Sequence, residues 1–349
     1  MTIFVALLGL IFLIVIHELG HMLTAKAFGV RVPEFGIGFG PSIFKKQFGK
    51  TIYSFRIILL GGFAKIAGMG DGEEGEDTYY AKAPWKRALM IFAGPGVNLV
   101  FAVLIFSGVL MFQGVPTQTE REVEAVSPGT MAEQVDLQAG DTLLAVDGQS
   151  VQSWEGFTGK IENRSPGEEV AITVRRDGET LTVNGELGSR GGTSDEPLVG
   201  VNPVISEVSH SPFVALWEGS QRTVQLVGLY VTGLAQLVTG QIDFFDNVSG
   251  PVGITTIGSE AVSSGIVPAL GTLAIISMVL GVMNLLPILP LDGGHLLMIA
   301  IEKLRGKPIS EETMGKVATV GLMLFLTVFL FATYADISKI IEGQPFIPQ

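Results

Sequence analysis

Cysteine is absent from this chain of 349 residues, and histidine is scarce. Without cysteine the chain can form neither a disulfide nor a thiolate metal site, so its cysteine usage does not indicate a redox compartment. Any metal must then be held by imidazole or oxygen ligands. The four histidines are His17, His21, His210 and His295.

Charge is also sparse. Only 16% of the residues are charged and 47% are hydrophobic, and the mean hydropathy is +0.47. This composition is too apolar for a soluble protein of this length. Four segments contain apolar runs of the roughly 20 residues that a membrane-spanning helix needs. They are residues 1–28, 88–112, 266–298 and 317–338.

The first apolar segment contains a metal-binding pattern. Between Thr2 and Leu23 the only ionisable residues are His17, Glu18 and His21. Two histidines four residues apart share one face of a helix, and HExxH is a zinc metalloprotease signature in which the glutamate takes a proton from water at the metal. The alternative is two core histidines and a chance glutamate. It leaves a carboxylate in lipid without a function, which is costly.

A third ligand is expected late in the chain. Residues 266–291 carry no charge until Asp292, which follows two prolines and precedes Gly293. A carboxylate after a proline-broken helix end is well placed to bind a metal, because irregular backbone at membrane depth must be buried or line a cavity. Asp292 is preferred as the deeper residue. The alternatives are that Asp292 is a cap or turn residue, or that His295 is the ligand.

Together these motifs resemble the site-2 protease family of intramembrane zinc metalloproteases, in particular the bacterial branch with a single PDZ domain. The similarity extends over nearly the whole chain. The motifs that carry it are residues 17–21 (HELGH), 36–41 (GIGFGP), 61–65 (GGFAK), 93–98 (AGPGVN), 250–254 (GPVGI) and 284–295 (NLLPILPLDGGH).

The resemblance implies a role for each site residue. His17, His21 and Asp292 are the expected ligands of a Zn²⁺ cofactor, and Glu18 is the expected catalytic base. Asn98 falls where the family has a second-span asparagine linked to substrate handling, so it is the expected substrate-binding residue.

The sequence predicts a polytopic α-helical membrane protein with four transmembrane helices, a membrane-associated β-hairpin region and an inserted extracytoplasmic PDZ (α+β) domain. Residues 29–87 are predicted to be a β region and a loop, since residues 30–68 alternate apolar and polar side chains with many glycines, which indicates short β-hairpins dipping toward the membrane. An edge strand there would hold a substrate extended for cleavage. The alternative is a plain cytoplasmic connector.

Residues 117–201 contain short strands and Gly-Asp turns, which resemble a PDZ domain of the bacterial protease type. Such a domain binds an extended peptide or excludes bulky substrates, and the sequence does not separate these roles. Residues 202–265 are predicted to form an amphipathic membrane-surface helix and a linker. Polar residues recur through 212–240, which argues against a fifth span.

The distribution of charge predicts the orientation. Residues 26–87 contain ten Lys and Arg, whereas residues 113–212 contain six against seventeen Asp and Glu. Basic loops stay cytoplasmic, so residues 113–212 and both termini are expected outside. His17, about 20 Å along its helix, and Asp292 then both lie toward the cytoplasmic side. The expected location is the bacterial plasma (inner) membrane.

The predicted function is cleavage of peptide bonds within or next to transmembrane segments of single-span membrane proteins. By family resemblance the substrates include anti-sigma factors or remnant signal peptides already cut by a site-1 protease. Two alternatives come from other classes of protein. A PDZ-bearing scaffold with a structural metal would have no use for Glu18, and a metal transporter would spread its ligands along several spans. No nucleic-acid partner is expected.

Overall fold

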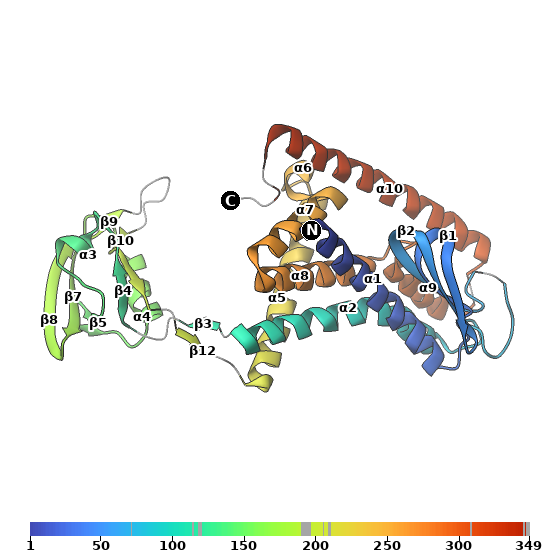
Figure 1. Ribbon diagram of the computed structural model, residues 1–349, viewed down its shortest axis with the longest axis horizontal. Helices are drawn as coiled ribbons and strands as arrows, with labels where there is room; N and C mark the ends of the chain where they lie inside the picture. The colour runs from blue at the N-terminus through green and yellow to red at the C-terminus, as the bar shows by residue number, and fades with distance from the viewer. Residues whose placement is uncertain are drawn as a thin grey trace. The chain divides into compact units, whose positions relative to one another are not determined.

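The computed structural model divides the chain into two compact units (Figure 1). The main unit comprises Met1–Val109 and Pro212–Gln349, and the inserted unit comprises Leu110–Ser211. The structure describes residues 1–70, 72–113, 115–117, 121–189, 197–204, 206–208, 211–307, 309–344 and 346.

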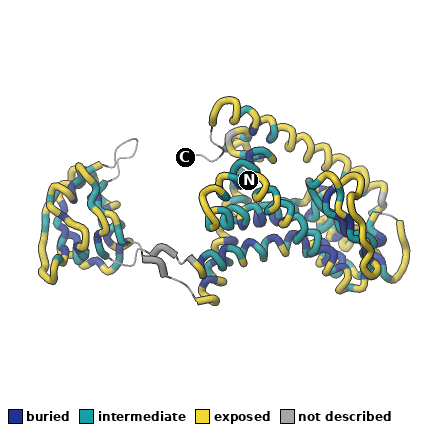
Figure 2. Tube along the Cα trace, viewed as in Figure 1, coloured by how far each residue is buried: buried dark blue, intermediate teal, exposed yellow. Residues whose placement is uncertain are grey.

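Four helices of the main unit are long and apolar enough to cross a membrane, in agreement with the four predicted segments. They are α1 (Thr2–Ala27), α2 (Pro84–Gln113), α8 (Ile266–Asn284) and α10 (Glu311–Glu342). Long runs without charge form such helices because lipid offers no partner for the backbone, which must satisfy its own hydrogen bonds. Most of α10 is exposed (Figure 2), as expected for a helix whose surroundings are lipid.

The third span is shorter than the sequence predicted. Helix α8 ends at Asn284, and the chain is irregular until α9 (Asp292–Arg305) begins. Pro287 and Pro290 account for the break, since each lacks a backbone N–H and disfavours helical geometry in the residue before it. Asp292 therefore stands at the start of a new helix.

The segment after the inserted unit contains three helices, α5 (Pro212–Val238), α6 (Phe244–Asn247) and α7 (Pro251–Ser264). The predicted amphipathic helix corresponds to α5. Helix α7 lies in the stretch predicted as a linker, and it packs against α1, α8 and α10. The buried carboxylate of Asp336 in α10 accepts the backbone N–H groups of Gly250 and Gly253, which joins α10 to the start of α7.

The β region forms one long hairpin instead of several short ones. Strands β1 (Glu34–Phe48) and β2 (Thr51–Lys65) each have 15 residues. Gly38 and Gly40 both have positive φ, so β1 bends and folds back on the hairpin. As a result residues 34–37 pair both with 52–55 and with 62–65. In the described register, residues 62–65 pair only with β1 and form an edge.

The inserted unit is a small α+β structure built around a four-stranded sheet in the order β6–β5–β7–β8. Alternate residues of β7 are buried, as in a strand with one face on a core. The other described strand pairs are β4 with β11, β9 with β10 and β3 with β12. Its elements are β3 (Val115–Thr117), β4 (Val123–Val126), α3 (Met131–Gln134), β5 (Thr142–Val146), β6 (Gln149–Ser150), α4 (Trp154–Glu162), β7 (Glu169–Arg176), β8 (Glu179–Glu186), β9 (Gly188–Ser189), β10 (Pro197–Leu198), β11 (Val201–Pro203) and β12 (Ser206–Val208).

A buried ion pair ties the inserted unit together. Arg176 donates from Nε and Nη2 to the two carboxylate oxygens of Asp141, both at 2.7 Å. Burial alone would raise the pKa of Asp141, but the bonds from Arg176 and from the Gln138 backbone N–H hold this pKa below its ordinary value. The ion pair therefore supports the fold of this unit at neutral pH.

Candidate metal centre

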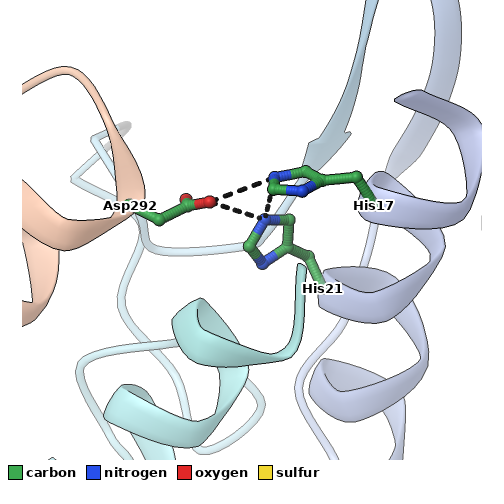
Figure 3. A group of neighbouring side chains, drawn as sticks. All are labelled: His17, His21 and Asp292. Atoms are coloured by element: carbon green, nitrogen blue, oxygen red, sulfur yellow. Dashed lines mark hydrogen bonds and ion pairs between the residues drawn. The ribbon is translucent and has the colours of Figure 1, made fainter. Parts of the chain in front are cut away.

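Two segments far apart in the sequence meet at one point of the main unit (Figure 3). His17 and His21 project from one face of α1 because they are four residues apart, and both are buried. Asp292 reaches them from the first turn of α9. Oδ2 of Asp292 lies 3.0 Å from Nε2 of His17 and 3.4 Å from Nε2 of His21, and the two Nε2 atoms are 3.2 Å apart.

The chemistry of these atoms fits a cation. Nδ1 of His21 lies 2.9 Å from the backbone carbonyl of Met90, so this nitrogen carries the proton and Nε2 of His21 presents a lone pair. The carboxylate of Asp292 is also an acceptor. Ligand atoms in a tetrahedron around one zinc ion lie about 3.3–3.5 Å from each other. The spacing of the three atoms is close to that value. Nε2 of His21 and the carboxylate oxygen of Asp292 are both acceptors, and a metal ion between them explains why they lie so close together.

Helix α2 can pack directly against the two imidazoles because it has glycine at the point of contact. A Cβ atom added to Gly94 would lie 2.2 Å from Nε2 of His21 and 2.9 Å from Nε2 of His17. Helix α1 approaches α2 equally closely, since a Cβ atom on Gly20 would lie 2.5 Å from the carbonyl oxygen of Ala93. Glycine on both helices thus allows α1 and α2 to pack closely at the two imidazoles.

Glu18 stands beside the three atoms without belonging to the group that they form. Its side chain is directed to strand β2, and its Cγ would lie 3.1 Å from a Cβ atom on Gly62. Glu18 is only partly buried, and its side chain lies against the part of β2 that contains Gly62.

Asn98 lies behind His17, at the ring nitrogen that faces away from the other two residues. Its Nδ2 is 3.4 Å from Nδ1 of His17, and its side chain is almost completely buried. Its Oδ1 has no hydrogen-bond partner. The structure therefore brings Asn98 to the candidate centre, but on the far side of a histidine.

Of the other two histidines, the structure describes His295, which is not in the group. His295 follows one turn after Asp292 and lines a cavity with Tyr79, Arg87 and Glu302. His210 lies outside the described residues. Among the described residues, the cluster of metal-binding side chains consists of His17, His21 and Asp292.

Sequence reasoning missed two supporting contacts. The carbonyl of Met90 has no signature in the sequence because every residue carries one. Arg87 was counted as a cytoplasmic charge, whereas it is buried and forms a bidentate ion pair with Glu302 of α9. The position of Arg87 at the start of an apolar helix was the sequence feature that could have indicated a buried ion pair.

A buried pair of histidines and a carboxylate, with a separate glutamate beside them on a membrane-length helix, defines a membrane metallopeptidase of the HExxH type. The model of Peptidase family M50 matches residues 5–328. The chain belongs to this family, the site-2 proteases, and is a zinc metalloprotease.

Relatives along the full length agree. The chain is similar to the zinc metalloprotease RasP of Shouchella clausii, with 30% identity over 94% of this chain and 96% of the relative. RasP of Oceanobacillus iheyensis is 29% identical, again over 94% and 96%. The PDZ domain of an SdrC-like protein from Listeria monocytogenes is 24% identical and covers 25% of this chain and 90% of that domain, with a TM-score of 0.23. So weak a structural likeness assigns no fold to the inserted unit.

Proposed function

We propose that this zinc metalloprotease hydrolyses peptide bonds within or next to the transmembrane segments of single-span membrane proteins. His17, His21 and Asp292 hold the zinc ion and Glu18 is the catalytic base. One observation carries the proposal: three ligand atoms converge between α1, a helix of membrane length, and the helix that follows α8. Ionisable residues on a helix of membrane length mark a functional site there, and a protease site at that depth can reach peptide bonds of membrane segments.

The roles of the residues follow from their positions. Zinc, when bound, supplies Lewis-acid activation of water and of the scissile carbonyl. Glu18 lies next to His17 in the chain but outside the ligand group, so its carboxylate is available to take a proton. It accepts the proton of the attacking water and then gives it to the leaving amine.

The hairpin presents the substrate. A helical segment must unwind before a peptide bond becomes reachable, and pairing with a strand holds it extended. Residues 62–65 of β2 form an edge of the hairpin, and Gly62 lies against Glu18. A substrate strand added at this edge would pass beside the catalytic base.

In this proposal the basic loops and the inserted segment face opposite sides of the bilayer. The basic loops around residues 26–87 and 303–316 are cytoplasmic, the metal site lies toward that side, and residues 117–201 form a PDZ domain outside. That domain binds an extended peptide or keeps bulky proteins from the site. The substrates are then anti-sigma factors or remnant signal peptides, shortened outside by a first protease, as the family resemblance implies.

The proposal is tested with a reporter transmembrane segment and the purified protein in lipid vesicles. Glu18→Gln should abolish cleavage while bound zinc stays near one ion per chain, because Glu18 acts on water and does not hold the metal. Glu260→Gln, an exposed residue of α7, is the matched control and should cleave as the unaltered protein does. Cleavage that survives in Glu18→Gln would overturn the proposed role of Glu18.

A further inference from the structure

The side-chain amide of Asn98 faces the imidazole of His17, but one of its two polar atoms has no hydrogen-bond partner. Its Nδ2 faces Nδ1 of His17 at 3.4 Å, while its buried Oδ1 has no partner. Only one of the two amide atoms faces a hydrogen-bonding group, so the orientation of the amide is decided by what the imidazole of His17 needs. Rotation of the amide by 180° exchanges its oxygen and nitrogen, which are hard to distinguish by shape.

His21 shows which arrangement the centre needs. The Met90 carbonyl accepts the proton on Nδ1 of His21, and this leaves Nε2 of His21 free to bind a metal. Nε2 of His17 faces the same point, 3.0 Å from Asp292 and 3.2 Å from Nε2 of His21. To bind a metal there, Nε2 of His17 must also be unprotonated, so Nδ1 of His17 must carry the proton and needs an acceptor.

We propose that Asn98 is a positioning residue for His17 and that its Oδ1 accepts the proton on Nδ1 of that imidazole. The bond selects the tautomer whose Nε2 lone pair points at the metal, and it fixes the plane of the ring. This inference rests on the proposed ligand role of His17. In this inference Asn98 orients a metal ligand and does not contact the substrate directly.

Contacts between α2 and α8 fix the position of the backbone at Asn98. Oγ of Ser277 in α8 donates to the carbonyl oxygen of Asn98 at 2.8 Å, and both residues are almost completely buried. One turn further along α8, a Cβ atom on Gly281 would lie 3.0 Å from the carbonyl oxygen of Pro95. Helices α2 and α8 are therefore in tight contact where the amide is placed, which limits its movement.

Burial also argues against substrate contact. Only 1% of the surface of Asn98 is exposed, and the imidazole of His17 lies between its amide and the three converging ligand atoms. A residue that binds substrate directly must be reachable from the reacting atoms. An amide behind a ligand acts through that ligand instead.

Zinc affinity tests the inference, because the position of a ligand affects binding of the metal even without a substrate. Asn98→Leu keeps the shape of the side chain and removes the acceptor, and it should weaken zinc binding about 10- to 100-fold in a chelator competition. Asn98→Asp keeps an acceptor and should bind zinc at least ten times more tightly than Asn98→Leu. The control is Ser107→Ala, which removes a buried hydroxyl of the same helix that donates to the backbone carbonyl of Val103.

A spectroscopic readout covers the case in which one variant fails to fold. With Co²⁺ in place of zinc, the visible absorption bands of Asn98→Leu, or of Ser277→Ala if Asn98→Leu is unstable, should shift from those of the unaltered protein. Unchanged zinc affinity and unchanged Co²⁺ bands, with only a raised KM, would overturn the inference and leave Asn98 as a substrate residue. His17→Ala separates the two proposals, since zinc retained in that variant contradicts the ligand role itself.

Discussion

At the scale of single residues, Gly94 is under the strictest steric limit at the metal centre. A methyl group there would lie 2.2 Å from Nε2 of His21, well inside van der Waals contact. Gly94→Ala should therefore displace the imidazole and lower zinc affinity at least tenfold, by analogy with other losses of support around a ligand. Equilibrium dialysis against buffered zinc measures this.

The control for Gly94→Ala lies on the same helix. Gly108 has open space where its Cβ would be, so Gly108→Ala should leave zinc binding unchanged. If Gly94→Ala binds zinc as tightly as Gly108→Ala does, the described approach of α2 to His21 is wrong.

The residues of the site differ in how far the sequence could predict them. The spacing of His17 and His21 follows from helix geometry alone, so their shared face needed no tertiary information. Asp292 is 271 residues beyond His21, and its place after an uncharged, proline-broken segment and the family resemblance both indicated it. The partners of the imidazoles could not be predicted, since the Met90 carbonyl and the Asn98 amide reach them only through the packing of α2 on α1.

At the scale of elements, the ion pair between Arg87 and Glu302 joins α2 to α9, the helix that begins with Asp292. The guanidinium donates to both carboxylate oxygens, at 3.0 and 2.7 Å, and lies 5.6 and 5.4 Å from the ring centres of Tyr79 and Tyr80. Loss of one partner leaves the other charge buried.

Arg87→Met should therefore destabilise the protein by about 3 kcal/mol, the lower end of the range for buried pairs because Glu302 keeps some contact with solvent. Arg87→Met combined with Glu302→Met should regain part of that loss. Unfolding in detergent micelles measures both variants. The exposed pair of Lys316 and Glu312 is the control and should cost less than about 1 kcal/mol. If Arg87→Met is as stable as a variant that lacks the Lys316–Glu312 pair, the ion pair of Arg87 and Glu302 does not stabilise the contact between α2 and α9.

The sequence predicted the elements unevenly. The apolar runs predicted the four long helices, because about twenty consecutive uncharged residues are typical of a membrane-spanning helix. The end of α8 was placed too late since apolar residues continue to Leu291, although the prolines had already stopped the helix. Helix α7 was missed because its sequence is only moderately apolar, and its packing against α1 and α8 is tertiary information.

At the scale of the whole molecule, the proposed four-span topology puts the segments between α1 and α2 and between α8 and α10 on one side of the membrane. The same proposal puts the inserted unit and both termini on the other side. Cysteines introduced singly at Ser150 and at Lys307, both exposed, should react with an impermeant reagent from opposite sides, Ser150 from outside. The chain has no cysteine of its own to interfere. Labelling of both from one side would mean that α5 also crosses the membrane.

The central claim is that one zinc ion joins α1 to α9 through His17, His21 and Asp292, and zinc content measures it most directly. Asp292→Asn removes the negative charge of one of three ligands and should lower both zinc per chain and proteolysis. His295→Ala, one turn further along α9, should retain zinc near one ion per chain because its imidazole lies outside the cluster. A full complement of zinc in Asp292→Asn, with an empty site in His295→Ala, would contradict the account and assign the metal to three histidines.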